Sequence, residues 1–350
     1  MDWLVNKIEQ PDKAYLIKAL DKQKQLTKPS GSLGLLEEIA VRLAAMQKTE
    51  HPSINRVWVS IFAADHGVAE ESVSAFPQIV TTEMVKNFVN SGAAINVLSR
   101  YIKADFEAID VGLIAAIDEE GVISERAGNG TENFAKQAAM TTGQMQSALA
   151  TGKAAVERAV IHKAQLFIGG EMGIANTTSA SAISVALTGM TVEQLTGAGT
   201  GINSGGIEHK ANVIKRAISL HQNFLKKPLN VLQYLGGFEI AALVGAYVFS
   251  AQQGLPILVD GFISTTAALL AVKINPEIQS WLIYAHCSEE KGHKFILDYL
   301  HAKPLLHLNM RLGEGSGAVT AVPLLKMACK LQSEMATFQQ AKITTKKEKR

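Results

Sequence analysis

The chain has 350 residues, of which 47% are hydrophobic and 19% are charged. This composition provides enough apolar material for one large core or two unequal domains, and it excludes disorder as the main state. With 34 Lys and Arg against 32 Asp and Glu, the formal charge is only +2, so the sequence as a whole offers no broad electrostatic surface for nucleic acid.

The cysteines and the N-terminus bear on the location of the protein. Cys287 and Cys329 stand in unrelated contexts and match neither a metal site nor a disulfide framework. Residues 1–7 carry early charges without a continuous apolar stretch, so they do not resemble a signal peptide. No later stretch has the length and polarity of a membrane span. We therefore expect a cytoplasmic protein.

The first 50 residues are predicted to form two helices. Apolar side chains recur at helical spacing around Leu16 and Leu20, and again over residues 35–46. Residues 27–34, between these stretches, are rich in Pro, Gly and Ser and are predicted to be a loop.

From residue 57 onward, short apolar runs alternate with helical stretches, and each run ends in small or polar residues. The predicted strands are 57–64, 106–109, 164–168, 256–259 and 281–284. Strands that alternate with helices pair in parallel through right-handed crossovers, and ligands bind outside their carboxyl ends. The expected fold class is therefore α/β, with a doubly wound, mainly parallel sheet and a ligand site at its carboxyl edge.

A helical pattern returns over residues 317–335, near the end of the chain. We expect a small helical domain built from residues 1–55 and 318–340, beside a large α/β substrate-binding domain of residues 56–317. Residues 341–350 form a basic tail that we expect to be disordered, as a solvated terminus rather than a nucleic-acid arm.

Two glycine-rich turns are candidates for anion binding. Residues 169–178 lead from a predicted strand into a helix, which the stretch beginning at Asn176 can cap while free N–H groups face an anion. Residues 196–201 precede Lys210, and glycine amides with one lysine suit a phosphate. Neither turn matches a Walker or dinucleotide motif. An ordinary capped turn or loop explains both about equally well.

Three histidines near predicted strand ends suggest metal or acid–base chemistry: His66, His286 and His293. They form no local ligand pair, and an isolated histidine of this kind is more often a hydrogen-bonded structural residue. We favour the structural interpretation and predict neither a metal nor a cofactor.

Residues 311–318 place Glu314 between two glycines, immediately before a predicted helix. Such a carboxylate is unobstructed, and closure of a site over it would remove water and raise its basicity. The alternative is a glutamate that interacts with the helix macrodipole, which would lower its pKa. The residues alone leave both possibilities open.

Short segments with a distinctive order of glycine, polar and apolar residues are spread along nearly the whole chain. They are 28–34, 64–68, 73–78, 87–88, 92–96, 170–174, 196–201, 236–240, 259–262, 285–288 and the loop of Glu314. In this order they resemble the family of nicotinate-nucleotide:dimethylbenzimidazole phosphoribosyltransferases, which act in the lower-ligand branch of cobalamin synthesis.

The resemblance implies a doubly wound parallel sheet with a smaller helical domain, a homodimer, and Glu314 as the catalytic base. It implies a base-binding pocket formed by Ser74, Phe76, Gln78, Met84, Glu171 and Met172. It implies ribose and phosphate contacts from Gly173, Asn176, Gly199, Gly201, Lys210, Asp260, Gly261, Phe262 and Ser288.

The implied reaction transfers the 5-phosphoribosyl group of nicotinate mononucleotide to 5,6-dimethylbenzimidazole, giving α-ribazole 5′-phosphate and nicotinate. The nicotinate of the mononucleotide is a pyridinium and already a good leaving group, so its expulsion needs neither metal nor acid. Glu314 would accept the azole proton while the other ring nitrogen attacks C1′.

The sequence departs from the family pattern at two places. Ala175 stands where a glycine is usual, which is tolerable if its φ is negative, and residues 127–140 match only loosely. Three alternatives stay open. They are transfer to adenine or a phenolic base, a non-catalytic nucleotide-binding regulator, and a nicotinamide-dependent oxidoreductase, which the missing dinucleotide motif disfavours.

Overall fold

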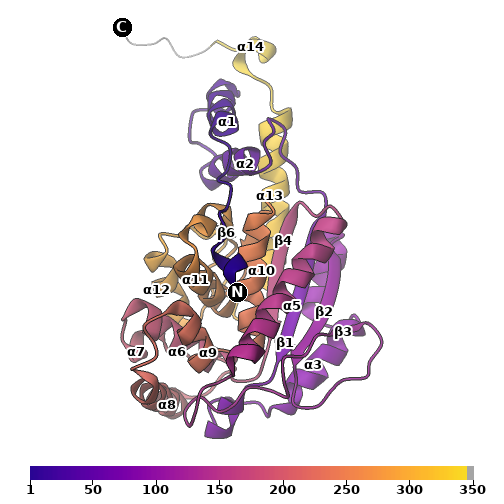
Figure 1. Ribbon diagram of the computed structural model, residues 1–350. Coiled ribbons are helices and arrows are strands. Elements are labelled where there is room, and N and C mark those ends of the chain that lie inside the picture. The colour runs from indigo at the N-terminus through magenta and orange to yellow at the C-terminus, as the bar shows by residue number, and fades with distance from the viewer. Residues whose placement is uncertain (345–350) are drawn as a thin grey trace.

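The computed structural model describes residues 1–344, so residues 345–350 of the predicted disordered tail lie outside the described part. Within it, six strands form one sheet in the order β3-β2-β1-β4-β5-β6, and every pairing is parallel (Figure 1). The strands are β1 Val57–Ala64, β2 Asp105–Gly112, β3 Val122–Ser124, β4 Leu166–Met172, β5 Ile257–Val259 and β6 Leu282–Tyr284. The predicted α/β class with a parallel sheet is confirmed.

Only β1 has its predicted extent; β5 and β6 each begin one residue later than predicted, and the other three strands differ more. β3 was missed, because it is a three-residue edge strand without a buried apolar run. β2 and β4 continue through polar and glycine residues that were predicted to follow them. Asp110 and Glu171 lie inside the sheet, because the pairing with β1 extends over both positions.

The order of the strands fixes where a ligand can bind. From β1 the chain winds outward through β2 and β3, then returns to the other side of β1 for β4, β5 and β6. The winding direction therefore reverses between β1 and β4. In doubly wound sheets this switch point opens a crevice at the carboxyl ends of the strands.

Helices cover both faces of the sheet. They are α1 Lys13–Gln25, α2 Leu35–Met46, α3 Ile79–Val89, α4 Ala94–Ile102, α5 Thr142–Ile161, α6 Asn176–Thr188, α7 Val192–Leu195, α8 Ser204–His221, α9 Pro228–Leu235, α10 Phe238–Gln252, α11 Phe262–Ile274, α12 Lys291–Tyr299, α13 Ser316–Glu334 and α14 Phe338–Ala341. The nearly fully buried α10 packs on β1, β2 and β4 beside α5. α3 contacts the same three strands, and α13 contacts β4 and α4. No helix within residues 1–344 has the length and apolar character needed to cross a membrane.

The two helices predicted in the first 50 residues are present as α1 and α2. Together with the far end of α13 they project from one end of the sheet (Figure 1). An isolated bridge between Leu26 and Thr337 joins the two ends of the chain there. α13 starts beside the sheet and continues without a break into this group of helices, so the division into two domains stays a prediction. Ala341, assigned to the tail, instead ends α14.

Candidate active site

A cavity of about 400 Å³ lies at the carboxyl ends of β4, β5 and β6. Eleven of the sixteen predicted site residues line it: Phe76, Met84, Glu171, Met172, Gly173, Asn176, Gly199, Gly261, Phe262, Ser288 and Glu314. Further lining residues, which the sequence did not single out for the site, include Thr177, Thr200, His286, Glu290 and Arg311. The fold thus gathers most of the predicted residues, from segments far apart in the chain, around one cavity.

Five predicted residues do not line this cavity, and three of them belong to neighbouring loops instead. The Ser74 hydroxyl lies 2.9 Å from the hydroxyl of Thr200, which ties two loops together. The Gln78 amide donates to the backbone carbonyl of His66 at 3.0 Å. Gly201 has a φ of +107° in the second glycine-rich turn. These residues shape the loops around the cavity, and the remaining two, Lys210 and Asp260, support it from behind.

The loop of Glu314 has an unusual backbone. Gly313, Glu314 and Gly315 have successive φ values of +86°, +61° and +75°. Glycine adopts this region without a Cβ penalty, so the flanking glycines permit the turn. A Cβ added to Gly170 of β4 would lie 2.8 Å from the carbonyl carbon of Glu314. The loop therefore lies directly on β4, where only glycine leaves room for it.

Asp260 holds this loop at the start of α13. Its side chain is 1% exposed, and its two carboxylate oxygens accept the N–H groups of Gly315 at 3.2 Å and Ala318 at 2.7 Å. These are donors that the first turn of a helix leaves unpaired. That Asp260 contacts ribose or phosphate stays a prediction; in the structure both of its oxygens accept backbone N–H groups. The helix start is thus satisfied by Asp260 and not by Glu314.

Glu314 is 6% exposed, and its pKa is raised to about 7 by burial and by the negative charge of Asp260. Gly315 is the N-cap of α13, and Glu314 comes one residue earlier. Glu314 therefore lies outside the first turn of the helix. If Glu314 interacted with the helix macrodipole, its pKa would be lowered, but the pKa is raised. The carboxylate has the properties of a general base near neutral pH.

Glu171 lies beside the same loop. A Cβ on Gly313 would lie 2.7 Å from its Oε1, and its Oε2 accepts a hydrogen bond from the Asn176 amide. Burial, and then the charge of Glu239, raise its pKa well above the ordinary range. An uncharged carboxyl group can both donate and accept a hydrogen bond.

A buried lysine lies behind two residues that line the cavity, Thr177 and Gly199. Lys210 is 1% exposed, and its Nζ donates to the Thr177 hydroxyl at 2.7 Å. A Cβ on Gly199 would lie 3.1 Å from the same Nζ. Burial lowers the pKa of Lys210 to about 8, and Glu290 opposes this change. A lysine behind a glycine turn, near the N-terminus of α6, is suited to an anion.

The start of α6 differs from the prediction. Its N-cap is Ala175 with a φ of +76°, and no side chain caps it, so the predicted cap at Asn176 is wrong. Asn176 instead donates to Glu171. The expectation that Ala175 is tolerable rested on a negative φ, and the observed value carries the Cβ penalty that the glycine usual in the family avoids.

We therefore expect Ala175→Gly to change the free energy of unfolding by no more than about 0.5 kcal/mol. Relief of the left-handed penalty offsets the lost methyl burial and the greater freedom of glycine in the unfolded chain. The matched change Ala182→Gly, inside α6 and fully buried, should cost about 2 kcal/mol. Urea denaturation of both variants measures the difference; equal losses would contradict the strained position.

The histidines differ in their surroundings. His66 Nε2 lies 2.7 Å from Glu239 Oε1, with both side chains fully buried. His293 Nδ1 accepts the Ser288 N–H at 2.9 Å, and burial lowers the pKa of His293 to about 3. Both are hydrogen-bonded inside the fold, whereas His286 lines the cavity. No cluster of three or more His, Cys, Asp or Glu suited to a metal occurs among residues 1–344.

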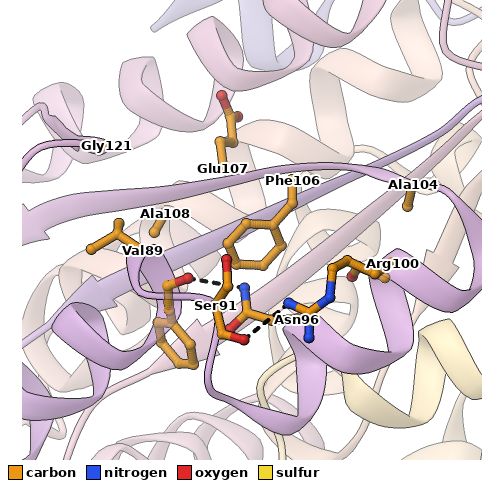
Figure 2. Close-up of a pocket in the computed structure, with 11 residues that line it drawn as sticks. Val89, Ser91, Asn96, Arg100, Ala104, Phe106, Glu107, Ala108 and Gly121 are labelled. Atoms are coloured by element: carbon orange, nitrogen blue, oxygen red, sulfur yellow. Dashed lines mark hydrogen bonds between the residues drawn. The ribbon is translucent and has the colours of Figure 1, made fainter.

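A second cavity, of about 340 Å³, lies beside β2 (Figure 2). There the Asn96 amide donates to the carbonyl of Phe88, and Arg100 donates to that of Ser91, both at 2.9 Å. Its polar side chains thus bind the connection between α3 and α4. Residues at the start of β2 line it, away from the carboxyl ends where parallel sheets bind ligands. The first cavity is therefore the candidate active site.

The fold and the site define a class of protein. A doubly wound parallel sheet, a switch-point cavity with a buried lysine behind a glycine turn, and a base-like carboxylate together describe an α/β enzyme for a phosphorylated nucleotide. A family model described as phosphoribosyltransferase matches residues 8–343, and the chain belongs to this family.

Similar proteins include relatives from two genera. The chain is 52% identical over 342 residues to the nicotinate-nucleotide--dimethylbenzimidazole phosphoribosyltransferase of Pseudomonas putida strain W619, covering 97% of each chain. It is 50% identical over 347 residues to the protein of the same name from Xanthomonas oryzae pv. oryzae strain PXO99A, covering 98% of this chain and 99% of the other. The crystal structure of CobT from Thermus thermophilus matches with a TM-score of 0.91 and 41% identity, covering 95% of this chain and 99% of the other.

Proposed function

We infer that this protein transfers the 5-phosphoribosyl group of nicotinate mononucleotide to 5,6-dimethylbenzimidazole. The products are α-ribazole 5′-phosphate and nicotinate, and the reaction belongs to assembly of the nucleotide loop of cobalamin. The observation that carries this inference is the buried Glu314, whose pKa is raised to about 7 and which lines the same cavity as Thr177, the residue that binds Lys210. Relatives about 50% identical over nearly the full length, which carry the name of this enzyme, support it.

The reaction is a displacement at ribose C1′. One ring nitrogen of the benzimidazole forms a bond to C1′ while the bond from C1′ to the pyridinium nitrogen breaks, and the electron pair neutralises the departing ring. Glu314 takes the proton from the other azole nitrogen, which keeps the new base neutral. General-base help of this kind contributes about 10² to 10⁴ in rate. Alignment of the two substrates in one cavity contributes the larger part.

The lining suggests where each substrate part binds. Phe76, Met84 and Met172 offer apolar surfaces to a flat bicyclic base. Burial raises the pKa of Glu171 well above the ordinary range, and in its protonated form Glu171 can donate a hydrogen bond to the base. Gly199 and Lys210 would hold the phosphate. In this arrangement Glu314 lies between the base and the ribose.

The direct test mixes purified protein with nicotinate mononucleotide and 5,6-dimethylbenzimidazole and follows α-ribazole phosphate and free nicotinate by mass spectrometry. Parallel reactions contain adenine or a phenolic base as acceptor. The proposal predicts both products with dimethylbenzimidazole. Product with adenine or phenol alone would identify the sister activity, and no product with any acceptor would favour a nucleotide-binding regulator.

The activity should depend on pH through Glu314, which must be ionised to accept a proton. Because its pKa is raised to about 7, kcat/KM should fall about tenfold per pH unit below pH 7. Asp260→Asn removes one cause of the raised pKa of Glu314, so the fall in kcat/KM should begin at a lower pH in this variant. A profile measured from pH 5 to 9 for both proteins separates titration of Glu314 from titration of the substrates. An identical fall in both proteins would contradict the assignment.

We also propose that the protein acts as a homodimer in the cytoplasm. Support for the dimer comes from the family resemblance, and support for the location comes from Cys287 and Cys329, which are both free thiols in the structure.

A further inference from the structure

One arginine at the candidate active site has no side-chain partner among residues 1–344. Arg311 is exposed and lines the cavity, three residues before Glu314. The guanidinium of Arg311 makes no hydrogen bond or ion pair within residues 1–344. The other arginines that the structure describes each donate to a carbonyl or carboxylate oxygen, namely Arg42, Arg56, Arg100, Arg126, Arg158 and Arg216. The guanidinium of Arg311 is therefore available to a ligand.

The donor nucleotide of the proposed function carries two anionic groups, a phosphate and the carboxylate on its pyridine ring. Lys210, behind Gly199 and Thr177, already provides a cation for the phosphate. Arg311 belongs to the loop that carries Glu314 and lies against Glu171. The pyridine ring is bonded to C1′, the atom beside which Glu314 acts. A cation on this loop is thus a candidate partner for the leaving group.

Resting on the proposed function, we propose that Arg311 binds the carboxylate of the nicotinate group and so makes the enzyme select nicotinate mononucleotide over its nicotinamide counterpart. A guanidinium matches a carboxylate with two parallel charge-assisted hydrogen bonds. A carboxamide is uncharged and presents one oxygen together with an N–H₂ group, which faces the guanidinium donors unfavourably. A site that binds a charged group of its ligand through hydrogen bonds discriminates strongly against ligands that lack this group, because such ligands leave a charged side chain of the site unpaired.

Glu290 is the acidic side chain that faces both cations. Burial raises its pKa, while the charge of Lys210, the N–H of Gly199 and the charge of Arg311 oppose that rise. The Glu290 carboxylate lies against Gly197 of the second glycine-rich turn. Glu290 thus lies beside the proposed phosphate site, and it forms no ion pair with Arg311 within residues 1–344.

The test measures Kd for nicotinate mononucleotide and for nicotinamide mononucleotide by calorimetry, without an acceptor base, and then kcat/KM for both. The proteins are the wild type, Arg311→Gln and the control Arg100→Gln, which removes the same charge outside the candidate active site. The wild type should bind the nicotinate form about 10 to 100-fold more tightly. Arg311→Gln should lose that preference through weaker binding of the nicotinate form alone, and Arg100→Gln should retain it.

Two results would overturn the proposal. One is a wild type that binds both nucleotides equally. The other is an Arg311→Gln protein that weakens both to the same extent, which would place Arg311 on a shared group such as the phosphate. Binding is measured without an acceptor base, so it does not depend on turnover. If the preference for the nicotinate form depends on Arg311 but no product forms, the proposed transferase activity is wrong, whereas the proposed role of Arg311 stands. Arg311 makes no side-chain bond within residues 1–344, so the melting temperature of Arg311→Gln should match that of the wild type.

Discussion

Replacing Glu314 by Gln is expected to lower kcat by about 10² to 10⁴ while nucleotide binding is nearly unchanged. The amide keeps the size and the burial of the side chain but cannot accept the azole proton. Substrate alignment and leaving-group departure are unaffected, so a residual rate should remain. Steady-state kinetics with nicotinate mononucleotide and dimethylbenzimidazole measure the loss. Turnover within about threefold of the wild type would remove Glu314 from the role of base.

The same variant supplies its own folding control. The pKa of Glu314 is raised in the folded state from 4.5 to about 7, so the folded protein binds this proton more tightly than the unfolded chain does. Wild-type stability therefore falls as the pH rises through this range, by up to about 3 kcal/mol. Glu314→Gln removes that dependence and should be more stable than the wild type at pH 8. A variant that is both inactive and less stable would point to misfolding instead.

Replacing Asp260 by Ala is expected to lower the free energy of unfolding by about 3 kcal/mol and to abolish most of the turnover. The change leaves the buried N–H groups of Gly315 and Ala318 without an acceptor, and each unpaired donor costs about 1–3 kcal/mol. The loop that positions Glu314 then loses its attachment to the end of β5. Chemical denaturation at pH 7 measures the first effect, and the dimethylbenzimidazole assay measures the second.

Asp260→Asn is the matched control, because its amide oxygen still accepts one of the two N–H groups. It should lose less stability than Asp260→Ala and keep a measurable rate. If Asp260→Ala were as stable as the wild type and as active, the assignment of Asp260 to the loop of Glu314 would be wrong.

The sheet could be predicted where burial leaves a strong pattern. β1 was predicted to the residue, because all eight of its side chains are buried and its end is marked by Asp65. β3 could not be predicted, because a short edge strand is specified by its neighbour β2 rather than by its own residues. Glu171 looked like a residue beyond the end of β4, since a buried carboxylate inside a strand is stabilised only by tertiary contacts such as that from Asn176.

Most of the predicted site residues line the cavity, but the sequence did not show which contacts each of them makes within the fold. Glycines around Glu314 marked that loop correctly as unusual, because the positive φ values have a local cause. The role of Asp260 could not be foreseen, since the two N–H groups that it accepts lie 55 and 58 residues away in the chain. Arg311 stood in a segment that the sequence singled out. Only the structure shows that its guanidinium is unpaired within residues 1–344 and that the residue lines the cavity.

The most direct test of the central claim is the configuration of the product. Purified protein would convert nicotinate mononucleotide labelled with ¹³C at C1′, in the presence of 5,6-dimethylbenzimidazole, and NMR would follow the labelled carbon. Displacement at C1′ predicts that every nicotinate released is matched by one ribosyl–benzimidazole bond of α configuration. A β-linked product, or release of nicotinate without a new bond to the base, would contradict the mechanism.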